Sequence, residues 1–226
     1  MQINDNRTRI NRLIENGYTF DLEKYFSEGW DLFRKQPGPF VVYALVAGII
    51  LMAIGFIPIF GAIVSAVISP PLTAGLFLGA RKIDLSGGAE LNDFFKGFDH
   101  IVQLFLLSLI SGVFITIGIV LLIIPGIWFA VAVGLSVPLV LFVKADFWEG
   151  ITLSVKLVNK KWFNFFALVI LLFLLNLVGT LVFFVGLLIT IPLTYCITYS
   201  AYKDIVGFSD DGGEMNVEDH LVEETD

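Results

Sequence analysis

Residues 36–80 read QPGPFVVYALVAGIILMAIGFIPIFGAIVSAVISPPLTAGLFLGA and contain no Asp, Glu, Lys or Arg over 45 positions. Two more runs without these residue types cover 101–143 and 162–202, with 43 and 41 positions. An α-helix rises 1.5 Å per residue, so about 20 residues cross a bilayer. Each run is therefore too long for one span and has the length of two spans joined by a tight turn.

Breaker residues near the middle of each run support this division. They are Pro58-Ile59-Phe60-Gly61, Pro125-Gly126 and Asn176-Leu177-Val178-Gly179. We therefore expect an all-α membrane protein whose six spanning helices form three hairpins. The predicted helices cover residues 39–57, 60–80, 101–124, 127–143, 162–178 and 181–202.

The composition agrees with a membrane protein of one domain. Of the 226 residues 57% are hydrophobic and 15% are charged, and the mean hydropathy is +0.85. The net charge is −7, with 9 of the 21 acidic residues after Lys203, which argues against a nucleic-acid partner. The single Cys196 excludes a disulfide framework. We expect a polar segment at 1–19, a membrane domain at 20–203 and an acidic, disordered tail at 204–226.

The distribution of basic residues predicts the orientation. All 14 Lys and Arg lie before residue 36, in 81–100, in 144–161 or at Lys203, and none lies in a predicted hairpin turn. Cytoplasmic loops carry the excess of basic residues in membrane proteins. The sequence therefore predicts that both termini are cytoplasmic, and the first span must act as the targeting signal because the first 20 residues contain no signal-peptide core.

A short amphipathic segment with aromatic residues precedes each hairpin. Such a segment either lies in the membrane interface or packs on the cytoplasmic end of the bundle, and the two interpretations are compatible. The expected interfacial anchors are Trp30 and Phe33, then Phe94 and Phe98, then Phe147 and Trp162.

Recurring landmarks predict an internal triplication. The second helix of each hairpin carries Ser/Thr-x-Pro-Leu, with Ser69 and Pro71, Ser136 and Pro138, and Thr190 and Pro192 as the motif residues. The distances from Gly29 to Pro71, from Gly97 to Pro138 and from Gly150 to Pro192 are 42, 41 and 42 positions. The predicted units are 20–82, 89–143 and 145–203, arranged about a pseudo-threefold axis along the membrane normal.

The motif itself has a local structural explanation. A proline in a helix leaves a carbonyl without its donor, and a nearby hydroxyl can bond that carbonyl. The second helices also carry small residues every four positions, which permit close packing in lipid. We therefore expect the second helices inside and the bulkier first helices toward lipid.

The charge-free runs contain none of the chemistry of an active site. Proton- and ion-coupled transporters usually keep ionisable residues at bilayer depth. With two His and one Cys there is no metal-ligand cluster, and HExxH, P-loop and GxSxG motifs are absent from the sequence. We expect no catalytic residue, no cofactor and no metal, and hence no enzyme.

Several local motifs are similar to those of a known family. They are Asn92-Asp93-Phe94-Phe95-Lys96-Gly97-Phe98, Ile124-Pro125-Gly126-Ile127-Trp128, Leu153-Ser154 and Lys161-Trp162. With these motifs the chain resembles, over most of 20–203, the bacterial inner-membrane family around YciC and the membrane domain of glycerophosphodiester phosphodiesterases. The resemblance implies six spans in a bacterial inner membrane and transfers no catalytic residue.

These observations lead to two functional hypotheses. The first is a non-enzymatic membrane scaffold or accessory protein that engages membrane lipids or a partner membrane protein. The alternative is a transporter or flippase for a small or lipidic solute, built from three parallel hairpin repeats. A hydrated cavity enclosed by the second helices would favour the alternative.

Overall fold

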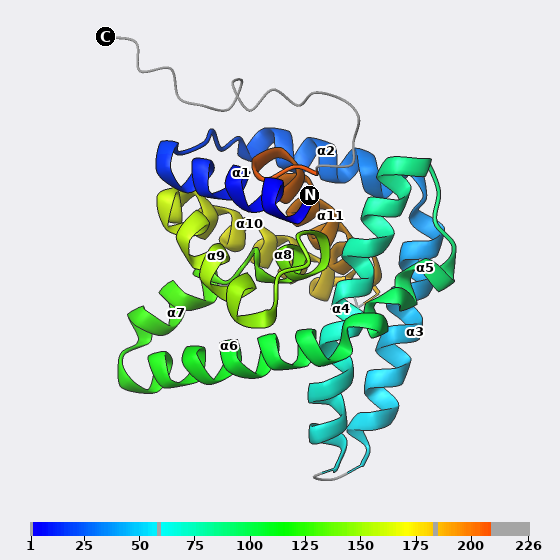
Figure 1. The fold of residues 1–226 in the computed structure, drawn as a ribbon. Coiled ribbons are helices and arrows are strands. Elements are labelled where there is room, and N and C mark those ends of the chain that lie inside the picture. Colours follow the sequence, from blue (N-terminus) through cyan, green and yellow to red (C-terminus); the bar gives the residue numbers. More distant parts are fainter. Residues whose placement is uncertain (1, 58–59, 183–184, 209–226) are drawn as a thin grey trace.

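The chain folds into helices throughout the part that the computed structural model describes, residues 2–57, 60–182 and 185–208 (Figure 1). The helices are α1 (Gln2–Asn16), α2 (Leu22–Lys35), α3 (Pro37–Gly55), α4 (Phe60–Ser86), α5 (Leu91–Phe95), the 3₁₀ helix η1 (Lys96–His100), α6 (Ile101–Leu121), α7 (Ile123–Ala132), α8 (Ser136–Phe142), α9 (Phe147–Lys160), α10 (Trp162–Leu181) and α11 (Leu187–Ile205).

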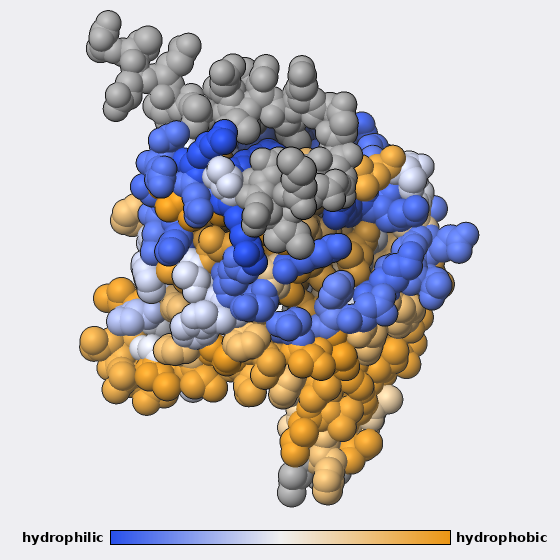
Figure 2. Space-filling view, in the orientation of Figure 1, coloured by the Kyte–Doolittle hydropathy of each residue, from blue (hydrophilic) through white to orange (hydrophobic). Residues whose placement is uncertain are grey.

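Five helical stretches within the described residues are long and apolar enough to cross a membrane. They are Pro37–Gly55, Phe60–Ser86, Leu91–Leu121, Ile123–Phe142 and Trp162–Leu181. Figure 2 shows hydrophobic side chains over the projecting hairpins and hydrophilic ones over the opposite end of the molecule. This arrangement is consistent with a multi-pass membrane protein.

The sixth expected helix, at 181–202, forms later in the chain, as α11 at Leu187–Ile205. It contains Lys203 and Asp204 in its last turn and is not among the stretches that are apolar enough to span by composition. Its tyrosines and threonines lower its hydropathy, so its role as a sixth span stays a prediction.

The fourth expected helix, at 127–143, is broken. Helix α7 ends at Ala132 and α8 begins at Ser136, with Gly134 between them. Ser154 of α9 bridges the break: its hydroxyl donates to the Ala132 carbonyl (2.8 Å) and accepts from the Leu135 N–H (3.1 Å). A side chain therefore replaces backbone hydrogen bonds that a continuous helix would make.

Two predicted turns lie elsewhere. Pro125 and Gly126 belong to the beginning of α7, and the connection from α6 is at Leu122. Proline fits the first turn of a helix because the N–H that it lacks has no partner there in any case. Asn176 and Gly179 lie inside α10, which continues to Leu181.

The helices contact each other in a cyclic order. Helix α5 with η1 packs on α4, α9 packs on α8, and α2 packs on α11. The second helix of each hairpin also contacts the first helix of another: α4 contacts α6, α7 contacts α10, and α11 contacts α3. In Figure 1 the α3–α4 hairpin runs down the view and the α6–α7 hairpin runs across it, so the hairpins splay apart away from their common hydrophilic end.

Hydrogen bonds between segments follow the same order. The Gln36 side chain accepts from the Ala89 N–H (2.7 Å), just before α5. The Gln103 side chain accepts from the Phe147 N–H (3.0 Å) at the start of α9. The Tyr18 hydroxyl donates to the Leu157 carbonyl of α9 (2.8 Å). The first two bonds join one hairpin unit to the beginning of the next amphipathic segment, and the third joins α9 back to the residues just before α2.

A glycine lies at each contact between an amphipathic segment and a second helix. A Cβ on Gly97 would lie 2.2 Å from the Pro71 carbonyl oxygen, and one on Gly29 would lie 2.6 Å from Ile197 Cα. A Cβ on Gly150 would meet Val140 Cγ2 at 2.7 Å. At Gly97 and Gly29 only glycine permits the approach with the backbones as they are, whereas at Gly150 the nearest obstacle is a side chain.

The segment 1–19, expected only to be polar, contains α1. Its buried residues Ile10 and Leu13 face the protein, α1 packs on α9, and Arg7 pairs with Glu149 at 2.8 Å. At the other end the folded part extends past the predicted boundary at 203, because Asp204 and Phe208 are both buried. Residues 209–226, which hold most of the predicted tail, lie outside the described residues.

Candidate functional site

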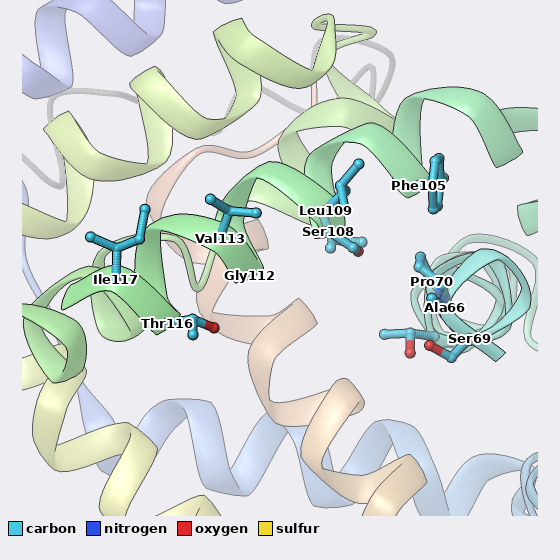
Figure 3. Close-up of a pocket in the computed structure, with 12 residues that line it drawn as sticks. Ala66, Ser69, Pro70, Phe105, Ser108, Leu109, Gly112, Val113, Thr116 and Ile117 are labelled. Carbon is cyan, nitrogen blue, oxygen red and sulfur yellow. The ribbon is translucent and has the colours of Figure 1, made fainter. Parts of the chain in front are cut away.

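A cavity of about 570 Å³ lies between α4 and α6, with Val137 of α8 at its edge (Figure 3). Ser69, Pro70 and Thr73 line it from α4, and Ser108 and Thr116 line it from α6. Among the described residues that line it, none is charged. Three of its apolar lining residues are about half exposed, so the cavity opens sideways along the hairpins; they are Leu109 (48%), Val113 (49%) and Ile117 (51%).

A second cavity, of about 430 Å³, lies on another side of α4, among α3, α4 and α11. Ser69 and Thr73 line this cavity as well, and Tyr43 and Tyr195 add hydroxyl groups. The Tyr43 hydroxyl already donates to the Leu72 carbonyl at 2.8 Å. The remaining lining is aliphatic and includes the exposed side chains of Leu45, Ile49 and Met52.

Backbone carbonyls add acceptors beside the first cavity. Pro70 and Pro71 lie inside α4 and have no N–H, so the carbonyls of Ala66 and Val67 lose their helical donors. Ala66 lines the cavity. The two cavities therefore have an apolar lining with a few neutral hydrogen-bonding groups. Such a lining is suited to binding and not to acid–base chemistry.

The six motif residues occupy different surroundings. Pro71, Pro138 and Pro192 are all buried. Ser69 lines both cavities, whereas Ser136 donates to the Val133 carbonyl (2.6 Å) and Thr190 donates to the Asn176 side chain (3.1 Å). The latter two hydroxyls thus do not bond the carbonyl that the proline of their own motif frees, contrary to the expected local role.

Asn176 joins the two helices of the third hairpin. Its side-chain amide donates to the Leu172 carbonyl and to the Thr194 hydroxyl, both at 2.8 Å, while its oxygen accepts from Thr190. The sequence suggested a turn at Asn176, but the side chain is instead the centre of a hydrogen-bonded cluster between α10 and α11.

The expected interfacial anchors divide into two groups. Phe33 (4% exposed) and Phe94 (0%) are buried in the protein, so these two rings pack inside it and not against lipid. The Phe94 ring fills the space over Gly79 of α4, while its backbone carbonyl lies against Gly75. Trp30 is about half exposed, and the remaining anchors, Phe98, Phe147 and Trp162, are partly buried.

Charged groups gather at the hydrophilic end, away from both cavities. Asp204 accepts from Lys24 and from the Tyr25 hydroxyl (3.0 Å), and Asp84 accepts from Lys203 (2.7 Å) and Tyr199 (3.0 Å). The hydrogen bond to Asp204 raises the pKa of Lys24, and burial raises the pKa of Glu28 on the same helix. These pairs fasten α2 to α11 and α4 to α11.

Within the described residues, no group of three or more His, Cys, Asp or Glu could hold a metal ion. Comparison of the chain with protein-family models, curated proteins and solved structures finds no match. The cavities, the Asn176 cluster and the Ser154 bridge were not predicted as such. Ser154 was named only within a family motif and Gln103 not at all, because a single polar residue at the edge of an apolar run has many possible partners.

Proposed function

We propose that this chain is a non-enzymatic scaffold or accessory protein of the bacterial inner membrane that binds lipid between its hairpins. The observation that carries the proposal is the pair of uncharged cavities beside α4, which share Ser69 and Thr73. Their open sides lie on helices that are apolar enough for a bilayer. In that setting a lipid acyl chain is the occupant that the aliphatic lining favours, and the hydroxyls can bond its ester oxygens.

The proposal includes six spans in three repeated units about a pseudo-threefold axis. The cyclic order of helix contacts supports it, as do the three glycine contacts at Gly29, Gly97 and Gly150. Both termini are proposed to be cytoplasmic, since the basic residues gather at one end of the chain's hairpins. The exposed part of α2, including Trp30, would then meet the lipid headgroups, and a partner membrane protein could bind at the same end.

Two glycines allow each cavity to be filled without disturbing the backbone. A Cβ on Gly112 or on Gly48 would meet open space, and these residues line the first and the second cavity respectively. Gly112→Leu and Gly48→Leu should each remove part of the lipid that co-purifies with the full chain in mild detergent. Native mass spectrometry of the purified protein measures the number and class of bound lipids.

The control is Gly55→Leu, because Gly55 also faces open space and lines neither cavity. Each replacement exchanges a helical glycine for leucine, so a general effect of the added side chain on stability applies to all three variants. Equal lipid retention by wild type and all three variants would refute lipid binding in the cavities.

The transporter or flippase hypothesis remains the second candidate. It is favoured because Ser69 and Thr73 line both cavities, so that only helix α4 separates the two. Proteoliposomes with a fluorescent phospholipid in one leaflet would test it. Movement of the label between leaflets that is slowed by Gly48→Leu or Gly112→Leu supports transport, and no movement above protein-free vesicles rejects it.

A further inference from the structure

The hydrophilic end of the molecule contains an arginine held between aromatic rings, where α4, α8 and α11 meet. The Arg81 guanidinium carbon lies 4.3 Å from the ring centre of Phe208 and 5.0 Å from that of Phe142. Arg81 takes part in none of the ion pairs between described residues, whose basic members are Arg7, Lys24, Arg34, Lys96 and Lys203. The rings stabilise the cation, but they do not neutralise it.

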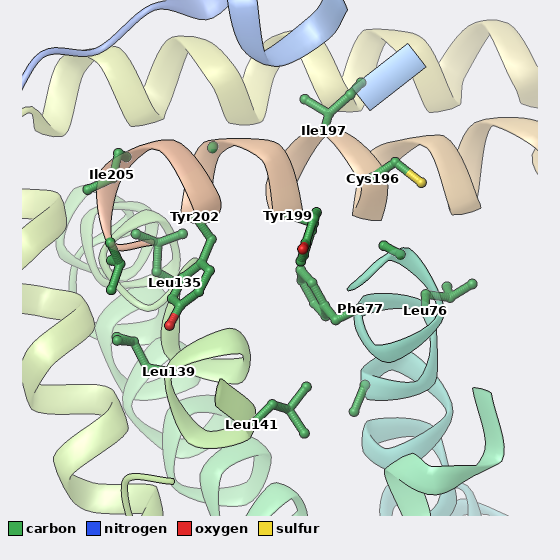
Figure 4. Packing of buried hydrophobic residues seen from close by; sticks show 14 of the residues in the cluster. Leu76, Phe77, Leu135, Leu139, Leu141, Cys196, Ile197, Tyr199, Tyr202 and Ile205 are labelled. Atoms are coloured by element: carbon green, nitrogen blue, oxygen red, sulfur yellow. The ribbon is translucent and has the colours of Figure 1, made fainter. Parts of the chain in front are cut away.

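Two buried donors at this place have no hydrogen-bond partner among the described residues: Arg81 Nε and the Tyr202 hydroxyl. Tyr202 is completely buried, and in Figure 4 its ring extends from α11 toward Leu139 of α8. Burying such groups without a partner is costly, so each of them calls for an acceptor from outside the protein, which water or a ligand can supply.

The surroundings of Tyr202 are positive. Both Arg81 and Arg9 act electrostatically on its hydroxyl, and the Arg9 guanidinium lies directly against Gly207. Gly207 has a φ of +66°, a conformation that glycine adopts without strain, so the chain can turn here and leave room for Arg9. Helix α1 and the end of α11 thereby bring a second guanidinium to the same place.

We propose that Arg81, Tyr202 and Arg9 form a binding site for a phosphate-type oxyanion. An arginine and a phenol both donate hydrogen bonds, and a ligand that accepts from both while carrying negative charge matches them better than water. Arg81 is also the first charged residue after the run 36–80, so it lies where the apolar part of α4 ends. This is the level at which a lipid phosphate or a soluble phosphate can reach it. The inference is independent of the cavities beside α4, which are uncharged.

The test uses the purified full chain and its thermal unfolding, followed by tryptophan fluorescence. Inorganic phosphate is titrated against chloride at equal ionic strength, and in nanodiscs phosphatidic acid is compared with phosphatidylcholine. Arg81→Gln should raise the apparent Kd for phosphate or phosphatidic acid by about tenfold or more, since it removes charged hydrogen bonds. Arg34→Gln is the control because it removes the same charge from an exposed position on α2.

Tyr202→Phe provides a second variant in case Arg81→Gln does not fold. It keeps the packing, and without ligand it should be at least as stable as wild type because a buried hydroxyl without a partner is removed. Its affinity for the anion should nevertheless fall several-fold. Stabilisation by inorganic phosphate assigns the site to a soluble ligand, and stabilisation by phosphatidic acid alone assigns it to a lipid headgroup.

Three results would overturn the proposal. The first is an equal phosphate effect in wild type, Arg81→Gln and Tyr202→Phe, which is what general salt exclusion produces. The second is the absence of any effect of phosphate or phosphatidic acid on wild type. The third is stabilisation by phosphate or phosphatidic acid that depends on Arg81 but is absent from wild type and appears only after Asp210→Asn and Asp211→Asn. In that case the site would hold the chain's own carboxylates and not a phosphate.

Discussion

At the scale of single residues, polar side chains inside the apolar part of the chain are used to join helices. Asn176 makes hydrogen bonds with Thr190 and Thr194 across the third hairpin. Ser154 performs the comparable task for the break between α7 and α8. In hydrocarbon a polar group without a partner is costly, so each of these contacts selects one register between neighbouring helices.

Asn176→Leu should therefore loosen the third hairpin. We expect a loss of about 0.5–1.5 kcal/mol in the free energy of unfolding, the range of hydrogen bonds between helices in membranes. Unfolding of the protein in mixed micelles measures it. Thr180→Val is the control because the Thr180 hydroxyl donates only along its own helix, to the Asn176 carbonyl. Equal stability of the two variants would show that the cluster does not hold α10 to α11.

Lys24 should stabilise the hydrophilic end through Asp204, whose side chain is 5% exposed. Lys24→Met removes a donor from this buried carboxylate, which should cost about 1–3 kcal/mol. Because the folded pKa of Lys24 is raised, its contribution is complete below the ordinary lysine pKa and is lost only as the pH rises through the raised value. The difference in melting temperature between wild type and Lys24→Met should thus be constant from neutral to mildly alkaline pH. Lys35→Met, on the same helix, should have little effect, and a similar loss in both variants would contradict a specific role for the pair.

At the scale of elements, the amphipathic segments work as packing elements of the protein. Each packs on a second helix through a glycine. The three glycine contacts differ in which atom a new methyl group would meet. At Gly97 the obstacle is a backbone carbonyl, whereas at Gly150 the nearest atom is a terminal methyl group of Val140. A side-chain methyl can move and a helix backbone cannot, so the glycine contacts should differ in how well they tolerate alanine.

Gly97→Ala should accordingly destabilise the protein by about 1–3 kcal/mol, the usual cost of overpacking. Gly150→Ala should cost clearly less, and Gly38→Ala should be neutral because a Cβ there meets nothing within 4 Å. Thermal unfolding of the three variants in one detergent gives the order. If Gly97→Ala is as stable as Gly38→Ala, the close approach of η1 to α4 is wrong.

The elements also show what could be predicted from the sequence. The starts of α4, α6 and α10, at Phe60, Ile101 and Trp162, agree with the expected positions, because the charge-free runs and their breakers define them. The break before Ser136 could not be predicted, because its stabilising partner, Ser154, comes from another helix. Helix α1 was missed because its apolar face is narrow: Ile10, Leu13 and Ile14 stand among polar residues. The candidate site was predicted only in part: the sequence singled out Ser69 as a member of the proline motif, but it did not indicate that Ser69 lines a cavity.

At the scale of the whole molecule, the prediction concerns topology. Cysteines at the hairpin tips should react only from the periplasm, and cysteines at Ser86 and Asn159 only from the cytoplasm, in a Cys196→Ser background. Gly61 and Gly126 belong to the turns predicted from the sequence, but both pack closely against backbone and cannot accept a cysteine side chain. The three tip cysteines are therefore placed at the exposed positions Phe60 (71%), Ile124 (81%) and Leu181 (76%).

Labelling with a membrane-impermeant maleimide in intact and permeabilised cells measures this. Reaction of all three tip cysteines from outside supports six spans, including α11. Protection of Leu181→Cys in intact cells would mean that the third hairpin does not cross the membrane, and would leave a protein with four spans.

The packing of α2 on α11 has a consequence for the synthesis of the chain. Helix α2 is synthesised among the first of the described helices, but α11, which contacts Tyr25 through Asp204 and Gly29 through Ile197, is synthesised after all the others. During translation Phe33 can already pack on Phe40 of α3, but the part of α2 around Tyr25 and Gly29 has no α11 to pack on and is exposed to the headgroup region of the bilayer or to a chaperone. The hairpins can insert one by one, yet the fold closes only when the final helix arrives. A nascent chain that stops before residue 187 therefore leaves the α11-contacting part of α2 uncovered, and quality control of an incomplete chain can begin there.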